Sequence, residues 1–271
     1  MLVANARMYA VEATTTRRWR ELFQWIAGCA GIDLEVIEHR PPAGLDELWM
    51  RRDLGAATMC GYPLATWNDR PRPEPLVAPV PSPEAFAGRA VYWTDIVVRA
   101  DSRFERDDDL AGMRFGWTAE RSQSGYQAPR RHFAARALER GGRFFGTVVG
   151  PLLTPRRVVE SILDGSIDAG PLDAYWHALL RLHEPGTAAR LRVVARTEDS
   201  PIPCLVSAHA IPQVQRGRLI QAFLDAAGAS GLREVLADLA LAGFVRVTVD
   251  RYEVLAERAH ATDALGYARL I

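Results

Sequence analysis

Short apolar segments alternate with amphipathic stretches along all 271 residues, and this alternation constrains the fold more than any other feature of the sequence. Buried strands of parallel sheets are short apolar runs, whereas amphipathic helices repeat their apolar residues every three to four positions. Hydrophobic residues make up 48% of the chain, enough for sizeable cores. The pattern predicts an α/β protein with mostly parallel sheets flanked by helices.

Ten segments have the composition of strands, and two helices have clear boundary signals. Thr16–Ala30 is followed by Gly31, a common helix stop, and Thr154-Pro155 is a typical helix start. Gly165 ends that second helix. The candidate strands are Leu2–Met8, Leu34–Ile37, Ala56–Met59, Leu76–Val80, Ala90–Val98, Arg114–Trp117, Ile167–Ala169, Arg192–Ala195, Cys204–Ala208 and Phe244–Val249. The last two long helices are expected at Pro212–Ala226 and Leu232–Ala242, followed by a strand and an amphipathic tail, Tyr252–Ala259.

Proline placement indicates how the chain divides into lobes. Trp67–Pro83 holds six prolines and is expected to be an extended surface passage with at most one edge strand. Ala90–Val98 is long enough to cross between two lobes, and Pro201-Ile202-Pro203 precedes a return crossing. The sequence predicts a first lobe of residues 1–93 plus 203–271 and a second lobe, 94–202, inserted between them. Ligands of such proteins bind at strand ends and helix starts in the interlobe cleft.

Charge excludes several classes of function. Basic and acidic residues number 33 each, so the net charge is zero and nucleic acid is not an expected partner. All 33 basic residues are arginine. A Schiff-base lysine and the lysine of a phosphate-binding P-loop are therefore excluded, and with them aminotransferase and kinase chemistry.

Neither cofactor nor metal is expected. The sequence contains no GxGxxG and no GxSxG motif, and its cysteines are too far apart for a disulfide framework or a metal site, so they are expected to be buried. These cysteines are Cys29, Cys60 and Cys204. The histidines show no metal-binding spacing and are expected at the surface or at helix caps. They are His39, His132, His177, His183, His209 and His260. Asp107-Asp108-Asp109 is expected to be a solvated helix start.

No membrane span is expected, because no apolar run approaches 18 residues. Met1–Tyr9 lacks the basic head and apolar run of an export signal. The sequence as given therefore predicts a cytoplasmic location, or a periplasmic one for a chain whose export signal was trimmed.

The most informative motif is the run from Gly116 to Pro129, GWTAERSQSGYQAP. A strand ends near Trp117, and a helix is expected to open near Pro129. Between them, Ser122-Gln123-Ser124-Gly125 places two hydroxyls and several backbone amides at a helix N-terminus, where the dipole is positive. This predicts an anion pocket built without lysine, or else a simple capping turn.

Two further loops have a similar character. Cys60-Gly61-Tyr62-Pro63 follows a strand, and Gly61 would let a ligand approach the backbone while Tyr62 covers it, unless the tyrosine packs in an ordinary turn. In the segment DGSIDAGPLDAYW, Asp173 stands where a new helix begins. It is either an N-terminal cap or a carboxylate that faces the cleft.

These three loops, in this order and at these intervals, resemble the phosphonate/phosphite-binding (PhnD-like) substrate-binding proteins of ABC transporters. The resemblance extends from about Tyr9 to Pro212. It implies a two-lobed type II periplasmic-binding-protein fold that closes on a small anionic organic ligand, an ABC permease as partner, and no catalysis.

The resemblance also implies roles for individual residues. Ser122, Gln123 and Ser124 would supply hydroxyls and amides to the oxyanion, and Asp173 would accept a hydrogen bond from the ligand. The remaining residues implied to contact ligand are Gly125, Tyr126, Gly61, Tyr62, Tyr9, Trp93 and Thr94. Phosphonate, sulfonate and carboxylate all suit such a cradle.

Two alternatives share the predicted fold. One is a cytoplasmic enzyme of the menaquinone-pathway type that acts on a ring-bearing carboxylate, which Trp93, Trp117, Tyr126 and Trp176 could hold. The sequence shows no acid and base pair whose spacing demands catalysis. The other alternative is a sensor that binds a metabolite and reports to a protein partner.

Overall fold

The structure is a computed structural model that describes residues 1–69 and 71–271. The chain forms two compact units. Unit 1 comprises Met1–Val91 and Pro201–Tyr252, and unit 2 comprises Tyr92–Ser200 and Glu253–Ile271. All of 203–271 was expected in the first lobe, whereas the tail from Glu253 onward belongs to unit 2.

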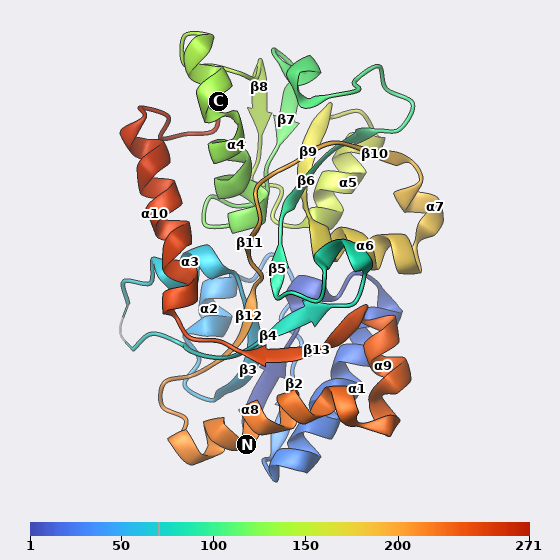
Figure 1. The fold of residues 1–271 in the computed structure, drawn as a ribbon, viewed down its shortest axis with the longest axis vertical. Coiled ribbons are helices and arrows are strands. Elements are labelled where there is room, and N and C mark those ends of the chain that lie inside the picture. The colour runs from blue at the N-terminus through green and yellow to red at the C-terminus, as the bar shows by residue number, and fades with distance from the viewer. Residues whose placement is uncertain (70) are drawn as a thin grey trace. The chain divides into compact units, whose positions relative to one another are not determined.

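Unit 1 is built on a six-stranded mixed sheet in the order β13-β4-β12-β3-β1-β2 (Figure 1). Its strands are β1 (Leu2–Asn5), β2 (Leu34–Val36), β3 (Leu54–Met59), β4 (Glu74–Pro81), β12 (Cys204–Ser207) and β13 (Leu241–Arg246). β1 pairs in parallel with β2 and β3, whereas β12 runs antiparallel to β3 and β4. The expected α/β architecture is confirmed, with more antiparallel pairing than the sequence predicted.

The helices of unit 1 begin and end at recognisable signals. They are α1 (Ala13–Ala30), α2 (Leu45–Trp49), α3 (Gly61–Ala65), α8 (Gln213–Asp225) and α9 (Arg233–Asp238), with short 3-10 turns η1 (Arg7–Tyr9), η2 (Glu84–Phe86), η5 (Ala226–Gly228) and η6 (Ser230–Leu232). Gly31 ends α1 in the left-handed conformation, as predicted, with φ 61°. α9 is shorter than expected because Ala240, at φ 48°, reverses the chain and β13 starts at Leu241.

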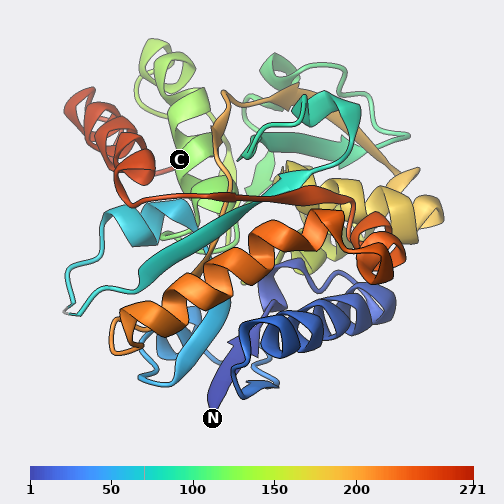
Figure 2. The same cartoon turned by 60° about the horizontal axis from the view of Figure 1, so that its bottom comes forward.

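Aromatic side chains join the helices of unit 1 to its sheet. Phe23 on α1 meets Phe223 on α8 edge to face, with ring centroids 6.3 Å apart, and Phe223 meets Phe244 on β13 at 5.1 Å. α1 and α8 therefore pack alongside each other against the sheet (Figure 2).

Of the passage Trp67–Pro83, residues 68, 69, 71 and 72 are exposed as expected and residue 70 lies outside the described residues, but the part that forms β4 was wrongly expected at a sheet edge. β4 lies between β13 and β12, and Leu76, Val77 and Ala78 are fully buried. Proline has no backbone N–H and cannot donate a hydrogen bond to a neighbouring strand. Both strands that pair with β4 shift their register beside it: β12 between Leu205 and Val206, and β13 between Leu241 and Gly243. These irregularities accommodate prolines in an interior strand.

The expectation for the cysteines holds for two of the three. Cys60 and Cys204 are buried, and Cys29 is exposed on α1. Burial raises the pKa of the Cys204 thiol to about 12, so this thiol stays protonated at neutral pH.

Unit 2 is built on a five-stranded sheet in the order β10-β6-β9-β7-β8. Its strands are β6 (Thr94–Arg99), β7 (Arg114–Gly116), β8 (Thr147–Val149), β9 (Ala169–Asp173) and β10 (Leu191–Arg196). β7 pairs in parallel with β8 and β9, and β6 runs antiparallel to β9 and β10. Two short strands, β5 (Val91–Tyr92) and β11 (Ser200–Pro201), form a separate two-stranded sheet.

The helices of unit 2 follow the strand ends. They are α4 (Ala128–Glu139), α5 (Pro155–Leu163), α6 (Ala174–His183), α7 (Pro185–Ala188) and α10 (Asp250–Ala264), with 3-10 turn η3 (Asp107–Leu110) and π-helical turn η4 (Gln123–Gln127). Thr154 caps α5 through its hydroxyl, which accepts from the amide of Arg157, and Pro155 opens the helix as predicted.

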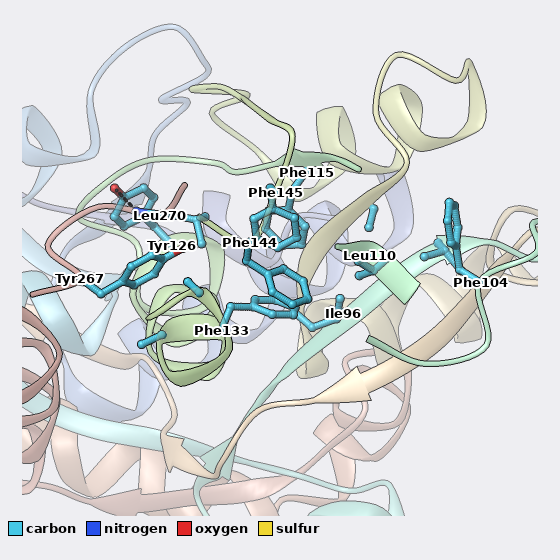
Figure 3. Packing of buried hydrophobic residues seen from close by; sticks show 14 residues of the cluster. Ile96, Phe104, Leu110, Phe115, Tyr126, Phe133, Phe144, Phe145, Tyr267 and Leu270 are labelled. Carbon is cyan, nitrogen blue, oxygen red and sulfur yellow. Dashed lines mark hydrogen bonds between the residues drawn. The ribbon is translucent and has the colours of Figure 1, made fainter. Parts of the chain in front are cut away.

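An aromatic cluster forms the core of unit 2 (Figure 3). Phe115 stacks on Phe145 with centroids 4.4 Å apart, and Phe133 stacks on Phe144 at 4.8 Å. The C-terminal residues Tyr267 and Leu270 belong to the same cluster. The chain end is therefore part of this core.

Asp107 is the one aspartate of its triplet that the structure buries, contrary to the expected solvated helix start. Its Oδ2 lies 2.6 Å from His132 Nε2 and accepts from Arg136 Nη1 at 2.7 Å. Burial alone would raise its pKa, but the hydrogen bond from His132 and the charge of Arg136 outweigh burial and hold the pKa below the usual 3.8.

We predict that this cluster makes unit 2 sensitive to acid. Because the pKa of Asp107 is lowered by folding, its contribution is fully present above pH 3.8 and is lost as pH falls through the lower folded value. Asp107→Asn should lower the free energy of unfolding by about 2 kcal/mol at pH 7. Urea titrations at pH 7 and near pH 3 check this, and an equal loss at both would contradict it.

Candidate functional site

The predicted residues of unit 2 gather at one edge of its sheet. The parallel strands β7, β8 and β9 end at Gly116, Val149 and Asp173, and β6 begins at Thr94, directly opposite Asp173. Because the carboxyl ends of parallel strands meet at the same edge, the loops that leave them are neighbours. This is where α/β proteins place ligands.

The serine turn, residues Ser122–Gln127, leads into α4 at this edge. The Ser122 side chain caps η4, its Oγ accepting from the amide of Gly125 at 3.0 Å. The amide of Gln127 donates to the carbonyl of Ser122 at 3.0 Å, which gives the turn its π-helical character. The first amides of a helix have no acceptor within it, and π-helical turns often occur at functional sites.

Two threonines hold the serine turn in place. Thr94 Oγ1 donates to the carbonyl of Ser124 at 3.0 Å, and the amide of Thr118 donates to the carbonyl of Gly125 at 3.2 Å. Gln123 is buried, with its Nε2 3.4 Å from Ser200 Oγ. Thr94 is thus a hydrogen-bond donor to the turn. Thr118 was not among the residues predicted to matter for the site.

Gly125 is required sterically rather than for backbone freedom. A Cβ at this position would lie 1.8 Å from Thr118 Oγ1 and 2.9 Å from Thr118 Cβ. Threonine has few alternative rotamers, so the turn itself would have to move.

We therefore predict that Gly125→Ala destabilises the protein by about 2 kcal/mol through overpacking. Adding Thr118→Ala should restore part of that loss, because it removes the nearest clashing atom. Gly28→Ala serves as the control, since nothing lies within 4 Å of a Cβ at this position on α1. Thermal unfolding of the three variants checks the prediction, and equal melting temperatures for Gly28→Ala and Gly125→Ala would contradict it.

The indole ring of Trp93 is held by a hydrogen bond at its edge and by a cation on its face. Its Nε1 donates to Asp95 Oδ1 at 2.8 Å, and the Arg196 guanidinium lies 3.8 Å from the ring centroid. Asp95 Oδ2 in turn lies 2.7 Å from Nδ1 of His177, which is 2% exposed. The expectation of a surface or capping role is therefore wrong for His177, which is a buried partner of Asp95.

Asp173 and Tyr126, two other residues predicted to contact the ligand, form hydrogen bonds within unit 2. Asp173 Oδ1 accepts from the amides of Tyr175 and Trp176, so the residue caps α6. Tyr126 Oη accepts from the amide of Leu270 at 3.2 Å, and its ring belongs to the aromatic cluster of Figure 3.

The remaining predicted contacts lie on unit 1, also beyond the ends of parallel strands. Tyr9 ends η1, just after β1, and is buried. Gly61 and Tyr62 open α3, just after β3, and Tyr62 is half-buried. β1 and β3 pair directly, so the two loops leave neighbouring positions of one sheet edge.

Among residues 1–69 and 71–271, no group of three or more His, Cys, Asp or Glu side chains is placed to hold a metal ion. Over the same residues, no helix combines the length and apolar character needed to cross a membrane.

Comparisons with known proteins agree with this architecture. The binding-protein component of an ABC phosphonate transporter from Pseudomonas aeruginosa matches with a TM-score of 0.80 at 16% identity, over 98% of this chain and 87% of its own. PhnD1 from Prochlorococcus marinus in complex with methylphosphonate gives 0.73 at 15% identity, over 97% and 98%. XAC2383 from Xanthomonas citri bound to ATP gives 0.65 at 18%, over 98% of each. No curated protein matches the sequence.

The fold is thus that of the two-lobed periplasmic binding proteins. The family model described as "ABC transporter, phosphonate, periplasmic substrate-binding protein" matches residues 9–252. The chain belongs to this family of ABC-transporter substrate-binding proteins, as its motifs indicated.

Proposed function

We propose that the protein captures a small oxyanion-bearing organic ligand of the phosphonate or phosphite class, delivers it to an ABC permease and leaves it chemically unchanged. The observation that carries this proposal is the serine turn, where the Ser122 and Ser124 hydroxyls and the first amides of a long helix lie at the carboxyl edge of a parallel sheet. Hydroxyls, amides and a positive helix end suit an oxyanion.

Individual residues would act as follows. The half-buried hydroxyls of Ser122 and Ser124 donate to ligand oxygens, since Ser122 Oγ only accepts within the turn. Gln123 contributes its backbone amide, Gly125 shapes the turn through its bond to Ser122 Oγ, and Thr94 keeps the turn in position. The Tyr126 ring serves the core and its amide donates to the carbonyl of Ser122, so this residue would support the turn rather than contact the ligand.

The other predicted contacts would surround the ligand's remaining groups. Asp173 accepts a hydrogen bond from a protonated ligand oxygen while it caps α6. Trp93, fixed by Asp95 and Arg196, offers an aromatic contact from unit 2. Tyr62, Gly61 and Tyr9 are proposed to contribute from unit 1. The family assignment does not favour the enzyme and sensor alternatives.

Thermal shift against a panel of anions tests the proposal. The panel contains phosphate, phosphite, methylphosphonate, methanesulfonate and benzoate. A ligand that binds only the folded state at a hundred times its Kd stabilises that state by about 2.7 kcal/mol. We expect methylphosphonate or phosphite to raise the melting temperature and to be recovered unchanged. A rise with benzoate alone, or loss of the added compound, would contradict the proposal.

A further inference from the structure

The loop after β8 runs directly beside the serine turn. The amide of Leu152 donates to the carbonyl of Trp117 at 2.9 Å, and the amide of Leu153 donates to the carbonyl of Thr118 at 3.0 Å. Thr118 is the residue that holds Gly125. Leu153 is therefore only two backbone hydrogen bonds away from the turn proposed to hold the oxyanion.

Leu153 combines two features that are unfavourable for a leucine. Its φ is +67°, in the left-handed region that glycine and asparagine prefer, and its side chain is 51% exposed. The neighbouring Leu152 instead points into unit 2, since its Cδ1 would lie 2.9 Å from a Cβ at Gly116. A large apolar side chain thus stands at the site edge on strained backbone, and such strain is common at ligand contacts.

An aromatic residue, Trp117, lies on the same loop pair. The Trp117 ring stands so close to Gly150 that a Cβ there would lie 2.6 Å from it, and Trp117 meets Tyr126 edge to face at 5.2 Å. The serine turn thus has an aromatic neighbour in Trp117, and Leu153 follows the residue whose backbone bonds to Trp117.

We propose that Leu153 is a specificity-determining residue that packs against an apolar substituent of the ligand while the serine turn holds its oxyanion. This inference rests on the proposed function and deepens it, because it names the ligand class as phosphonates that carry an alkyl chain. A leucine cannot solvate an ammonium group, so an aminoalkyl substituent would lose water without gaining a partner. Inorganic phosphate has no group for Leu153 to contact.

Calorimetry with a ligand series tests the inference. The probes are phosphate, methylphosphonate, propylphosphonate and 3-aminopropylphosphonate, titrated into the full chain. Each methylene buried against Leu153 should raise affinity about fourfold, so propylphosphonate, with two more methylenes, should bind roughly 16-fold more tightly than methylphosphonate. The amino compound should bind more weakly than propylphosphonate.

Leu153→Asn isolates the side chain, because asparagine suits the left-handed backbone and the variant should fold normally. We expect it to abolish the gain with chain length while the Kd for methylphosphonate changes less than about threefold. Leu182→Asn is the control, since Leu182 on α6 is equally exposed at 51%. It should keep the wild-type series.

The outcomes separate this inference from the proposed function. If methylphosphonate binds but the wild-type affinities do not rise with chain length, or Leu153→Asn keeps the rise, the role of Leu153 is overturned and the proposed function stands. If no member of the series binds, both are overturned.

Discussion

Removing both hydroxyls of the serine turn, by Ser122→Ala together with Ser124→Ala, is expected to weaken methylphosphonate binding by roughly 10²- to 10⁴-fold. Each hydroxyl is proposed to donate to a charged oxygen, and a hydrogen bond to a charged group is worth about 1.5–3 kcal/mol. Without these donors the ligand would give up hydrating water for an incomplete cradle. Isothermal titration calorimetry measures the loss directly.

A matched control separates ligand contact from folding. Ser122 Oγ also caps η4, so its removal alone should cost about 1 kcal/mol of stability. Ser166→Ala removes a hydroxyl that bonds to Asp164 in the loop before β9, at the opposite edge of the sheet, and should leave affinity unchanged. A folded double variant that binds with wild-type affinity would overturn the site assignment.

The second large effect concerns Arg130, which ties the C-terminal segment to the helix that continues the serine turn. Its side chain is 3% exposed and donates to the carbonyls of Tyr267 and Ala259 and to Gln127 Oε1. It also forms an ion pair with Asp263 on α10. Figure 1 shows α10 beside α4, where these bonds are made.

Arg130→Met is expected to lower the free energy of unfolding by about 3 kcal/mol, because it leaves buried carbonyls without donors. Asp263→Asn is the matched control. The Asp263 side chain is 49% exposed, so losing its charge should cost less than about 1 kcal/mol. Urea unfolding measures both values. If the two variants lose equal stability, the ion pair with Asp263 rather than the buried carbonyls carries the effect, contrary to this account.

Much of the fold was predictable from the sequence because its signals are local. The Thr154-Pro155 start of α5 and the Gly31 end of α1 depend on residues adjacent to the helix ends, and both were predicted. The short strand β8 was missed because Thr147–Val149 is too short to show a period. β4 was misplaced because its prolines are accommodated by register shifts in other strands.

Some residues of the candidate site were likewise predictable from the local sequence, and others were not. The serine turn was found because its residues are contiguous, and the strand order places it beside Thr94 and Asp173. Thr118 and Leu153 were not found, since their importance depends on hydrogen bonds across loops and on a left-handed backbone. The partnership of His177 with Asp95 likewise joins α6 to β6 and leaves no local motif.

The central claim is that this chain binds a phosphonate and does not transform it. Titration of methylphosphonate into the 271-residue chain by calorimetry, followed by phosphorus NMR of the recovered ligand, tests this most directly. We expect saturable binding of one ligand per chain and an unchanged phosphorus spectrum. Absence of binding by methylphosphonate and phosphite, or a new phosphorus signal after incubation, would contradict the account.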